Sequence, residues 1–180
     1  LDPNDGWSFR VDELRRTLED AERSGGVRAL ILNSPNNPTG KVFSLEELGQ
    51  LATLAREFDF YIITDEIYEH ILYDGHRHHP IGILPGMRER TITISGLSKT
   101  FSVTGWRIGY VIAPRELTNA IRKMQDFITV GAAAPLQEAA AHALRSDEEY
   151  YLKLSSHYAK RRDFLCGVLE KIGFRVWKPS

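Results

Sequence analysis

The apolar residues along the chain predict alternating helices and short strands. Residues 11–23 place Val11, Leu14 and Leu18 on one helical face, and residues 45–58 carry apolar side chains at the same spacing. Short apolar runs rich in β-branched residues predict four strands, at residues 27–33, 60–64, 90–95 and 107–113. Further helices are predicted at residues 65–73, 116–127 and 146–172.

Two of the predicted helices carry a recognisable start signal. Ser44 with Glu47, and Ser146 with Glu149, have the spacing of a capping box, in which a serine and a glutamate each bond the backbone N–H of the other. We therefore expect helices to begin at these two serines.

The predicted strands are continuously apolar, and a helix of about four turns joins the first two, which is typical of strands in a parallel sheet. The sequence therefore predicts an α/β fold with a mostly parallel sheet covered by helices on both faces. Between Ser95 and Arg107 there is no room for a crossover helix, so we expect the fourth strand to run antiparallel to the third.

Composition narrows the possible functions. The 180 residues, with 42% hydrophobic and 26% charged residues, suffice for one sizeable core. A net charge of −1 without a basic stripe argues against nucleic acid, and no apolar run is long enough for a membrane span. The single cysteine, Cys166, excludes an internal disulfide framework and is consistent with a cytoplasmic protein.

Polar clusters follow three predicted strands directly. The first strand leads into NSPNNPTG (33–40), the second into TDEIY (64–68) and the third into SGLSK (95–99). Ligands of such sheets collect beyond the carboxyl ends of the strands. We therefore expect Asn36 or Asn37, Asp65 with Tyr68, and Ser98 with Lys99 to form a site at one edge.

Each cluster also has a purely structural interpretation. Asp65 can cap the next helix, NNPTG can be only a turn, Lys99 can be solvated and Arg107 can belong to an ion pair. A purely structural account requires each of these separate interpretations to be correct. The coincidence of polar clusters at three strand ends therefore favours one shared site.

One chemistry uses all of these groups. A partly desolvated lysine forms a Schiff base with a carbonyl, as Lys99 would. A carboxylate such as Asp65 keeps a pyridine nitrogen protonated, and Asn and Tyr side chains donate to a ring oxygen. Small hydroxyl residues and one guanidinium, such as that of Arg107, bind a phosphate. This set suits pyridoxal 5'-phosphate.

Three motifs resemble one known family. The stretch GLSKTFSVTGWRIG (96–109) resembles the lysine motif of the class I aminotransferases, which are fold type I, pyridoxal-phosphate-dependent enzymes. NSPNNPTG and TDEIYE resemble two further motifs of that family, in the same order, and the likeness covers essentially the whole chain. It is closest to the prokaryotic aspartate aminotransferase branch, and implies the fold of that family's large domain.

The resemblance implies a role for each matching residue. Lys99 would be the Schiff-base lysine and proton shuttle, and Asp65 would pair with the pyridine nitrogen. Asn37 and Tyr68 would bond the ring oxygen. Ser98 and Arg107 would hold the phosphate. Relatives often carry serine three residues before the lysine, where this chain has Gly96, so only backbone contacts are expected there.

Family members are roughly twice as long as this chain, so the resemblance implies a fragment with little activity alone. Residues 1–145 would be part of the large cofactor-binding domain, and residues 146–180 a long interdomain helix with the start of the small domain. The parent would be a homodimer that transfers an amino group between an amino acid and a 2-keto acid.

Other functions stay open at this point. Carbon–sulfur lyases, synthases and decarboxylases share these motifs, and a non-catalytic truncated domain is a further alternative. A nucleotide-binding enzyme is disfavoured, because both common phosphate-loop patterns are absent. His76, His78 and His79 are interpreted as residues of a flexible surface loop, and no metal site is predicted.

Overall fold

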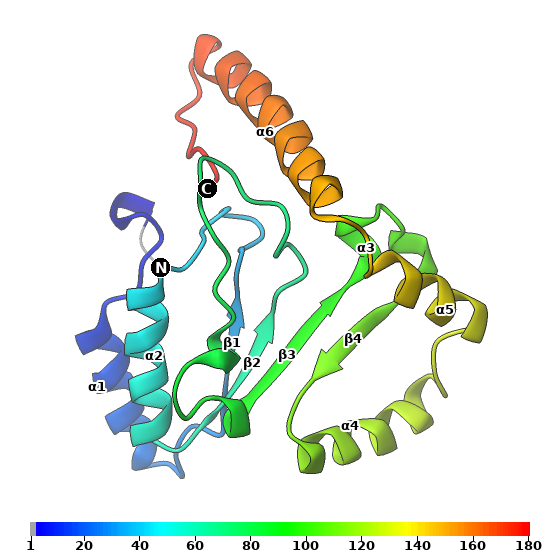
Figure 1. Cartoon of the computed structure of the whole chain (residues 1–180). Helices are drawn as coiled ribbons and strands as arrows, with labels where there is room; N and C mark the ends of the chain where they lie inside the picture. Colours follow the sequence, from blue (N-terminus) through cyan, green and yellow to red (C-terminus); the bar gives the residue numbers. More distant parts are fainter. Residues whose placement is uncertain (1–2) are drawn as a thin grey trace.

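Four strands form one sheet at the centre of the molecule (Figure 1). The structure, a computed structural model, describes residues 3–180. The sheet has the order β1-β2-β3-β4; β1, β2 and β3 are parallel, and β4 is antiparallel to β3. The strands are β1 (Ala29–Asn33), β2 (Tyr61–Asp65), β3 (Thr91–Gly96) and β4 (Gly109–Ile112). The predicted α/β class and the antiparallel fourth strand are confirmed.

Helices surround this sheet on several sides. In Figure 1, α1 and α2 lie together beside β1, α4 and α5 lie on the β4 side, and α6 extends beyond the carboxyl ends of the parallel strands. The α-helices are α1 (Val11–Glu22), α2 (Leu45–Glu57), α3 (Leu97–Thr100), α4 (Arg115–Ile128), α5 (Ala134–Ala143) and α6 (Glu148–Lys171). Short 3-10 helices are η1 (Pro3–Asp5), η2 (Ile81–Ile83), η3 (Arg88–Arg90) and η4 (Thr104–Trp106).

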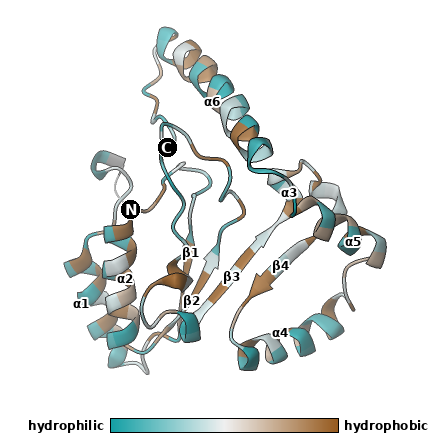
Figure 2. Cartoon of the chain, viewed as in Figure 1, coloured by the Kyte–Doolittle hydropathy of each residue, from teal (hydrophilic) through white to brown (hydrophobic). Residues whose placement is uncertain are grey.

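The main core lies between the sheet and helices α1 and α2. Leu48 and Leu51 of α2 pack with Phe60 and Ile62 at the start of β2, and all four are at most 2% exposed. Complete burial of such side chains contributes about 1.5–3 kcal/mol each, which fixes α2 against the sheet. In Figure 2, brown hydrophobic stretches lie along the strands, and brown and teal parts alternate along α1 and α2.

The opposite face of the sheet is less covered by residues 3–180. Ile31 of β1 is 77% exposed and Ile94 of β3 is 41% exposed. The register places Asn33, Asp65 and Ile94 in one row across the sheet, so Asp65 belongs to this second face. β1 is apolar on both faces, as predicted, whereas one face of β3 carries Thr91, Thr93 and Ser95. The described helices bury chiefly one face of the sheet.

Helix α2 begins at the predicted capping box. The Ser44 hydroxyl accepts a hydrogen bond from the Glu47 N–H at 3.2 Å, and the Glu47 carboxylate accepts one from the Ser44 N–H at 2.7 Å. Two N–H groups at the helix start are thereby satisfied. The box fixes where α2 begins, and so fixes the end of the loop that follows β1.

We expect Ser44→Ala to lower the free energy of unfolding by about 1 kcal/mol, because the Glu47 N–H loses its acceptor. Urea unfolding measures this change. Ser24→Ala is the control, since Ser24 is exposed after the end of α1. Equal unfolding midpoints for the two variants would contradict the capping role.

Two local predictions were wrong. Residues 65–73, predicted as a short helix, form hydrogen-bonded turns at 67–70, because the Glu66 side chain is buried and bonded to His78 instead of facing a helix surface. The predicted capping box at Ser146 is absent: α6 begins after Asp147, and the Ser146 N–H still bonds the Ala143 carbonyl at the end of α5.

Among residues 3–180, none of the helices combines the length and the apolar character that a transmembrane span requires.

Candidate active site

The carboxyl ends of the three parallel strands meet around one cavity of about 270 Å³. Asn37 comes from the loop after β1, Tyr68 from the turn after β2 and Lys99 from α3, directly after β3. The Asn37 side-chain amide donates to the Tyr68 hydroxyl at 3.3 Å, and the Lys99 ammonium lies 5.9 Å from the centre of the Tyr68 ring. The structure thus brings together three of the residues that the sequence singled out.

The loop after β1 is shaped by Asn36. The Asn36 N–H bonds the Lys41 carbonyl at 2.8 Å, and the Asn36 carbonyl accepts from the Gly40 N–H at 2.7 Å. Its side-chain oxygen accepts from the hydroxyl and the N–H of Thr39. Asn36 therefore closes the loop, whereas the side chain of Asn37 is directed to Tyr68.

Lys99 sits on a short helix that β3 and β4 position together. The Lys99 side chain is half-buried and lies on α3, whose first turn follows Gly96. A Cβ atom at Gly96 would lie 2.9 Å from the Ile108 carbonyl oxygen and 3.0 Å from the Gly109 Cα. Because the backbones approach so closely, glycine suits this position and a serine would require β3 and β4 to separate.

Asp65, Ser98 and Arg107 do not line this cavity. The Asp65 carboxylate accepts from the Ile67 N–H at 3.1 Å, as a residue that shapes the turn after a strand does. Arg107 is exposed, has a φ of 56°, and donates to the Thr104 carbonyl at 3.1 Å. Their predicted contacts with a cofactor remain predictions.

Part of the cavity wall comes from segments that the sequence did not indicate. Tyr73, Tyr158, Pro179 and Ser180 also line the cavity. Burial raises the pKa of the Tyr73 phenol, against the opposing effect of the nearby Arg162 charge, so Tyr73 is a neutral hydrogen-bond donor at pH 7. Tyr158 lies on α6 and Tyr73 in the loop after β2, and no local signal distinguishes these two from tyrosines that pack in a core.

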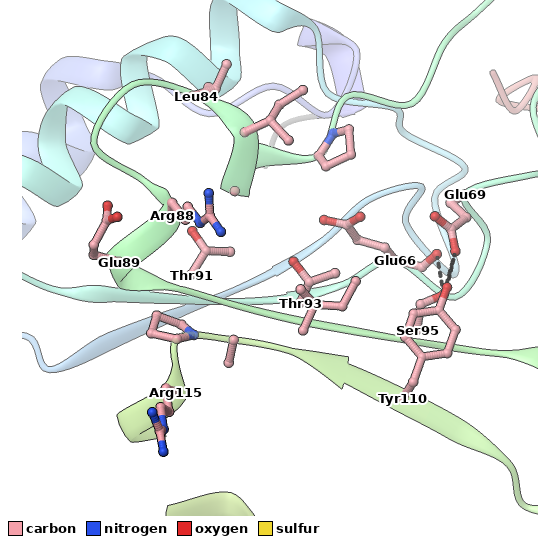
Figure 3. A pocket seen from close by; sticks show the side chains of 16 residues that line it. Glu66, Glu69, Leu84, Arg88, Glu89, Thr91, Thr93, Ser95, Tyr110 and Arg115 are labelled. Atoms are coloured by element: carbon pink, nitrogen blue, oxygen red, sulfur yellow. Dashed lines mark hydrogen bonds between the residues drawn. The ribbon is translucent and has the colours of Figure 1, made fainter. Parts of the chain in front are cut away.

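A larger cavity, of about 840 Å³, lies on the sheet face that bears Thr91 and Thr93 (Figure 3). At one end of it the Glu69 carboxylate accepts hydrogen bonds from the hydroxyls of Ser95, at 2.7 Å, and Tyr110, at 3.0 Å. Burial is the main reason why the pKa of Tyr110 is raised. None of the predicted cofactor-binding residues lines this cavity.

His78 lies beside the same cavity, and its predicted surface location was wrong. Its side chain is only 9% exposed, and its Nε2 atom lies 2.7 Å from a carboxylate oxygen of Glu66, which is buried. Ligand atoms of Glu66, Glu69 and His78 lie within 4.8 Å of one another, close enough to hold a metal ion. Both carboxylates also accept hydrogen bonds within this cluster, Glu66 from Thr64 and Glu69 from Ser95 and Tyr110.

Comparison with known proteins identifies the family. The family model described as aminotransferase class I and II matches residues 1–180. Over 95% of this chain, the sequence is 41% identical to the probable N-succinyldiaminopimelate aminotransferase DapC of Mycobacterium tuberculosis. Over 97% of this chain, it is 41% identical to the aspartate aminotransferase of Pyrococcus abyssi. It spans 42% and 44% of those two proteins, less than half of each.

Solved structures agree with this match. The structure superimposes on the aromatic aminotransferase of Pyrococcus horikoshii with a TM-score of 0.90 and 39% identity, covering 99% of this chain and 47% of that one. For the N-succinyldiaminopimelate aminotransferase of Mycobacterium tuberculosis the TM-score is 0.88 at 41% identity, with 94% and 43% covered. Members of the family use pyridoxal phosphate. The family match over residues 1–180, together with closely similar structures, shows that this chain belongs to the class I and II aminotransferases.

Proposed function

We propose that this chain is the cofactor-holding part of a pyridoxal-phosphate-dependent aminotransferase, which transfers an amino group between an amino acid and a 2-keto acid. One observation carries the proposal: Lys99, Tyr68 and Asn37 line a single cavity at the carboxyl ends of three parallel strands, in a chain that matches the family throughout. A primary amine beside hydroxyl and amide donors suits an aldehyde with a neighbouring ring oxygen.

In this proposal each residue has one task. The Lys99 amine would hold the cofactor covalently and, when free, would move a proton at the substrate α-carbon. Asn37 and Tyr68 would donate to the ring oxygen. Asp65 would pair with the pyridine nitrogen, and Ser98 and Arg107 would bind the phosphate. When bound, pyridoxal phosphate supplies an electron sink that stabilises negative charge on the α-carbon.

We further propose the domain boundaries expected from the sequence. Residues 1–145 belong to the large cofactor-binding domain, and residues 146–180 hold the interdomain helix and the start of a smaller domain. The long helix α6 (Glu148–Lys171) supports the second assignment. The working enzyme is a cytoplasmic homodimer in this proposal; the composition, with one cysteine, is consistent with that compartment.

The amino-acid substrate is not specified by the relatives. Proteins named for N-succinyldiaminopimelate and for aspartate are equally identical to this chain, at 41%, and a solved relative is named for aromatic substrates. A panel of acidic, aromatic and N-acylated amino acids, each paired with 2-oxoglutarate, is therefore the appropriate assay. Keto-acid formation without pyruvate or ammonia release would separate transamination from lyase chemistry.

The decisive test uses the chain as it stands with pyridoxal phosphate. We expect a visible Schiff-base absorbance that borohydride abolishes, with the reduced cofactor attached to Lys99 in peptide mass analysis. Amino transfer is expected to be slow, because the chain spans less than half of the length of its relatives. A cofactor adduct at other lysines only would overturn the proposal.

Asp65 provides a second test of the same proposal. We expect Asp65→Ala to lower the rate of amino transfer by at least about a hundredfold while the Schiff base still forms, because a paired carboxylate keeps the pyridine nitrogen protonated. Asp59→Ala, at an exposed position before β2, is the control. Turnover that is unchanged in the Asp65 variant, with the cofactor retained, would contradict the role of Asp65.

A further inference from the structure

Asn33, the last residue of β1, links two segments that carry candidate cofactor contacts. Its side-chain N–H donates to the Asp65 backbone carbonyl at 3.0 Å. Its side-chain oxygen accepts from the Asn37 backbone N–H at 3.0 Å and from the Asn36 side chain at 3.1 Å. Together with the hydrogen bond from the Ser34 N–H to the same carbonyl, at 3.1 Å, this amide group connects the loop after β1 to the end of β2. Asn33 itself does not line the cavity.

The two ends of this amide face different segments. The register pairs Asn33 with Asp65, so the two residues sit side by side where β1 and β2 end. The loop that follows is closed internally by Asn36. The bond from the Asn37 N–H to Asn33 ties this closed loop to the end of β1, at the residue whose side chain reaches Tyr68.

We propose that Asn33 is a positioning residue of the cofactor site, which holds Asn37 in register with Asp65 and with the cavity that contains Lys99. This inference rests on the proposed function, and it assigns to Asn33 a task that does not require contact with the cofactor. Aspartate in its place keeps the acceptor for the Asn37 N–H but loses the donor to the Asp65 carbonyl. Alanine loses both.

The first measurement needs no cofactor. Hydrogen exchange at the Asn37 backbone N–H reports whether the loop is held to the sheet. In Asn33→Ala we expect exchange at Asn37 to be at least about fivefold faster, as the loss of one hydrogen bond implies, and in Asn33→Asp we expect it to stay near the native rate. If the exchange rate at the Asn37 N–H is the same in Asn33→Ala as in the native chain, the proposal is overturned, whatever the chain binds.

The second measurement is the affinity for pyridoxal phosphate, from the Schiff-base absorbance. We expect Asn33→Ala to weaken binding by about tenfold or more, because the three hydrogen bonds of the Asn33 side chain are lost, and Asn33→Asp to restore part of the loss. The control is Ser34→Ala. Ser34 is the buried neighbour whose hydroxyl accepts from the Phe43 N–H, so this variant perturbs the same loop without touching Asn37.

The outcomes separate this inference from the proposed function. If the native chain forms no Schiff base at Lys99, the proposed function fails, and the exchange at Asn37 still decides whether Asn33 holds the loop. If the native chain binds pyridoxal phosphate and Asn33→Ala binds it equally well, the positioning role is wrong. Equal weakening by Ser34→Ala and Asn33→Ala would also contradict it, because the effect would then come from general loosening of the loop.

Discussion

Replacing Lys99 by alanine is expected to abolish both the Schiff base with pyridoxal phosphate and all amino transfer. Lys99 is the lysine of the candidate cavity, half-buried on α3 and 5.9 Å from the centre of the Tyr68 ring. In the proposed function Lys99 supplies both the amine that binds the cofactor aldehyde and the base that carries the α-proton, so alanine would remove both. We expect the rate to fall by at least about a thousandfold, as for other groups that are both nucleophile and base.

Two further variants make this test specific. Lys99→Arg keeps the positive charge but forms no Schiff base, so it is expected to behave like Lys99→Ala. Lys41→Arg is the matched control, because Lys41 is another partly buried lysine near the same loop but pairs with Glu47 at 2.8 Å. Borohydride trapping and a coupled keto-acid assay give the readouts. Trapped cofactor in Lys99→Arg, or a loss confined to Lys41→Arg, would refute the assignment.

Among the variants proposed for this chain, Arg162→Ala is expected to lower the free energy of unfolding most. Arg162 lies in the middle of α6 and is only 7% exposed. Its guanidinium donates to both carboxylate oxygens of Asp74, at 2.8 and 3.0 Å, and to the Pro179 carbonyl at 2.9 Å, and it stacks over the Tyr73 ring at 4.4 Å. Charged hydrogen bonds contribute about 1.5–3 kcal/mol each, so we expect a loss of at least about 2 kcal/mol.

The same side chain holds one wall of the candidate cavity. Tyr73, under the guanidinium, and Pro179, bonded to it, both line the cavity beside Lys99. Arg162→Lys keeps the charge but loses the two-pronged contact with Asp74, so it is expected to recover only a minor part of the stability. Arg161→Ala is the control, since Arg161 is the exposed neighbour on α6. Urea unfolding of the three variants tests this; a similar midpoint for Arg161→Ala and Arg162→Ala would contradict it.

Local patterns were sufficient to predict most of the elements. Strands β1, β2 and β3, helices α2 and α6 and the capping box at Ser44 follow from spacing alone, because apolar periodicity and end signals act within a few residues. The site at the strand ends was predictable for a related reason. In a parallel sheet the carboxyl ends share one edge, so Asn37, Tyr68 and Lys99 converge whatever the remaining packing is.

Other features were decided by contacts between distant residues. The segment after Asp65 is a turn and not a helix because Glu66 is buried against His78, twelve residues further along. The cavity wall depends on Arg162 bonding Asp74, which is 88 residues away. Helical periodicity carries no information on such partners. Local sequence thus determined which edge of the sheet carries the candidate site. Long-range packing determined the shape of that site, because hydrogen-bond partners are selected only once the elements have been brought together.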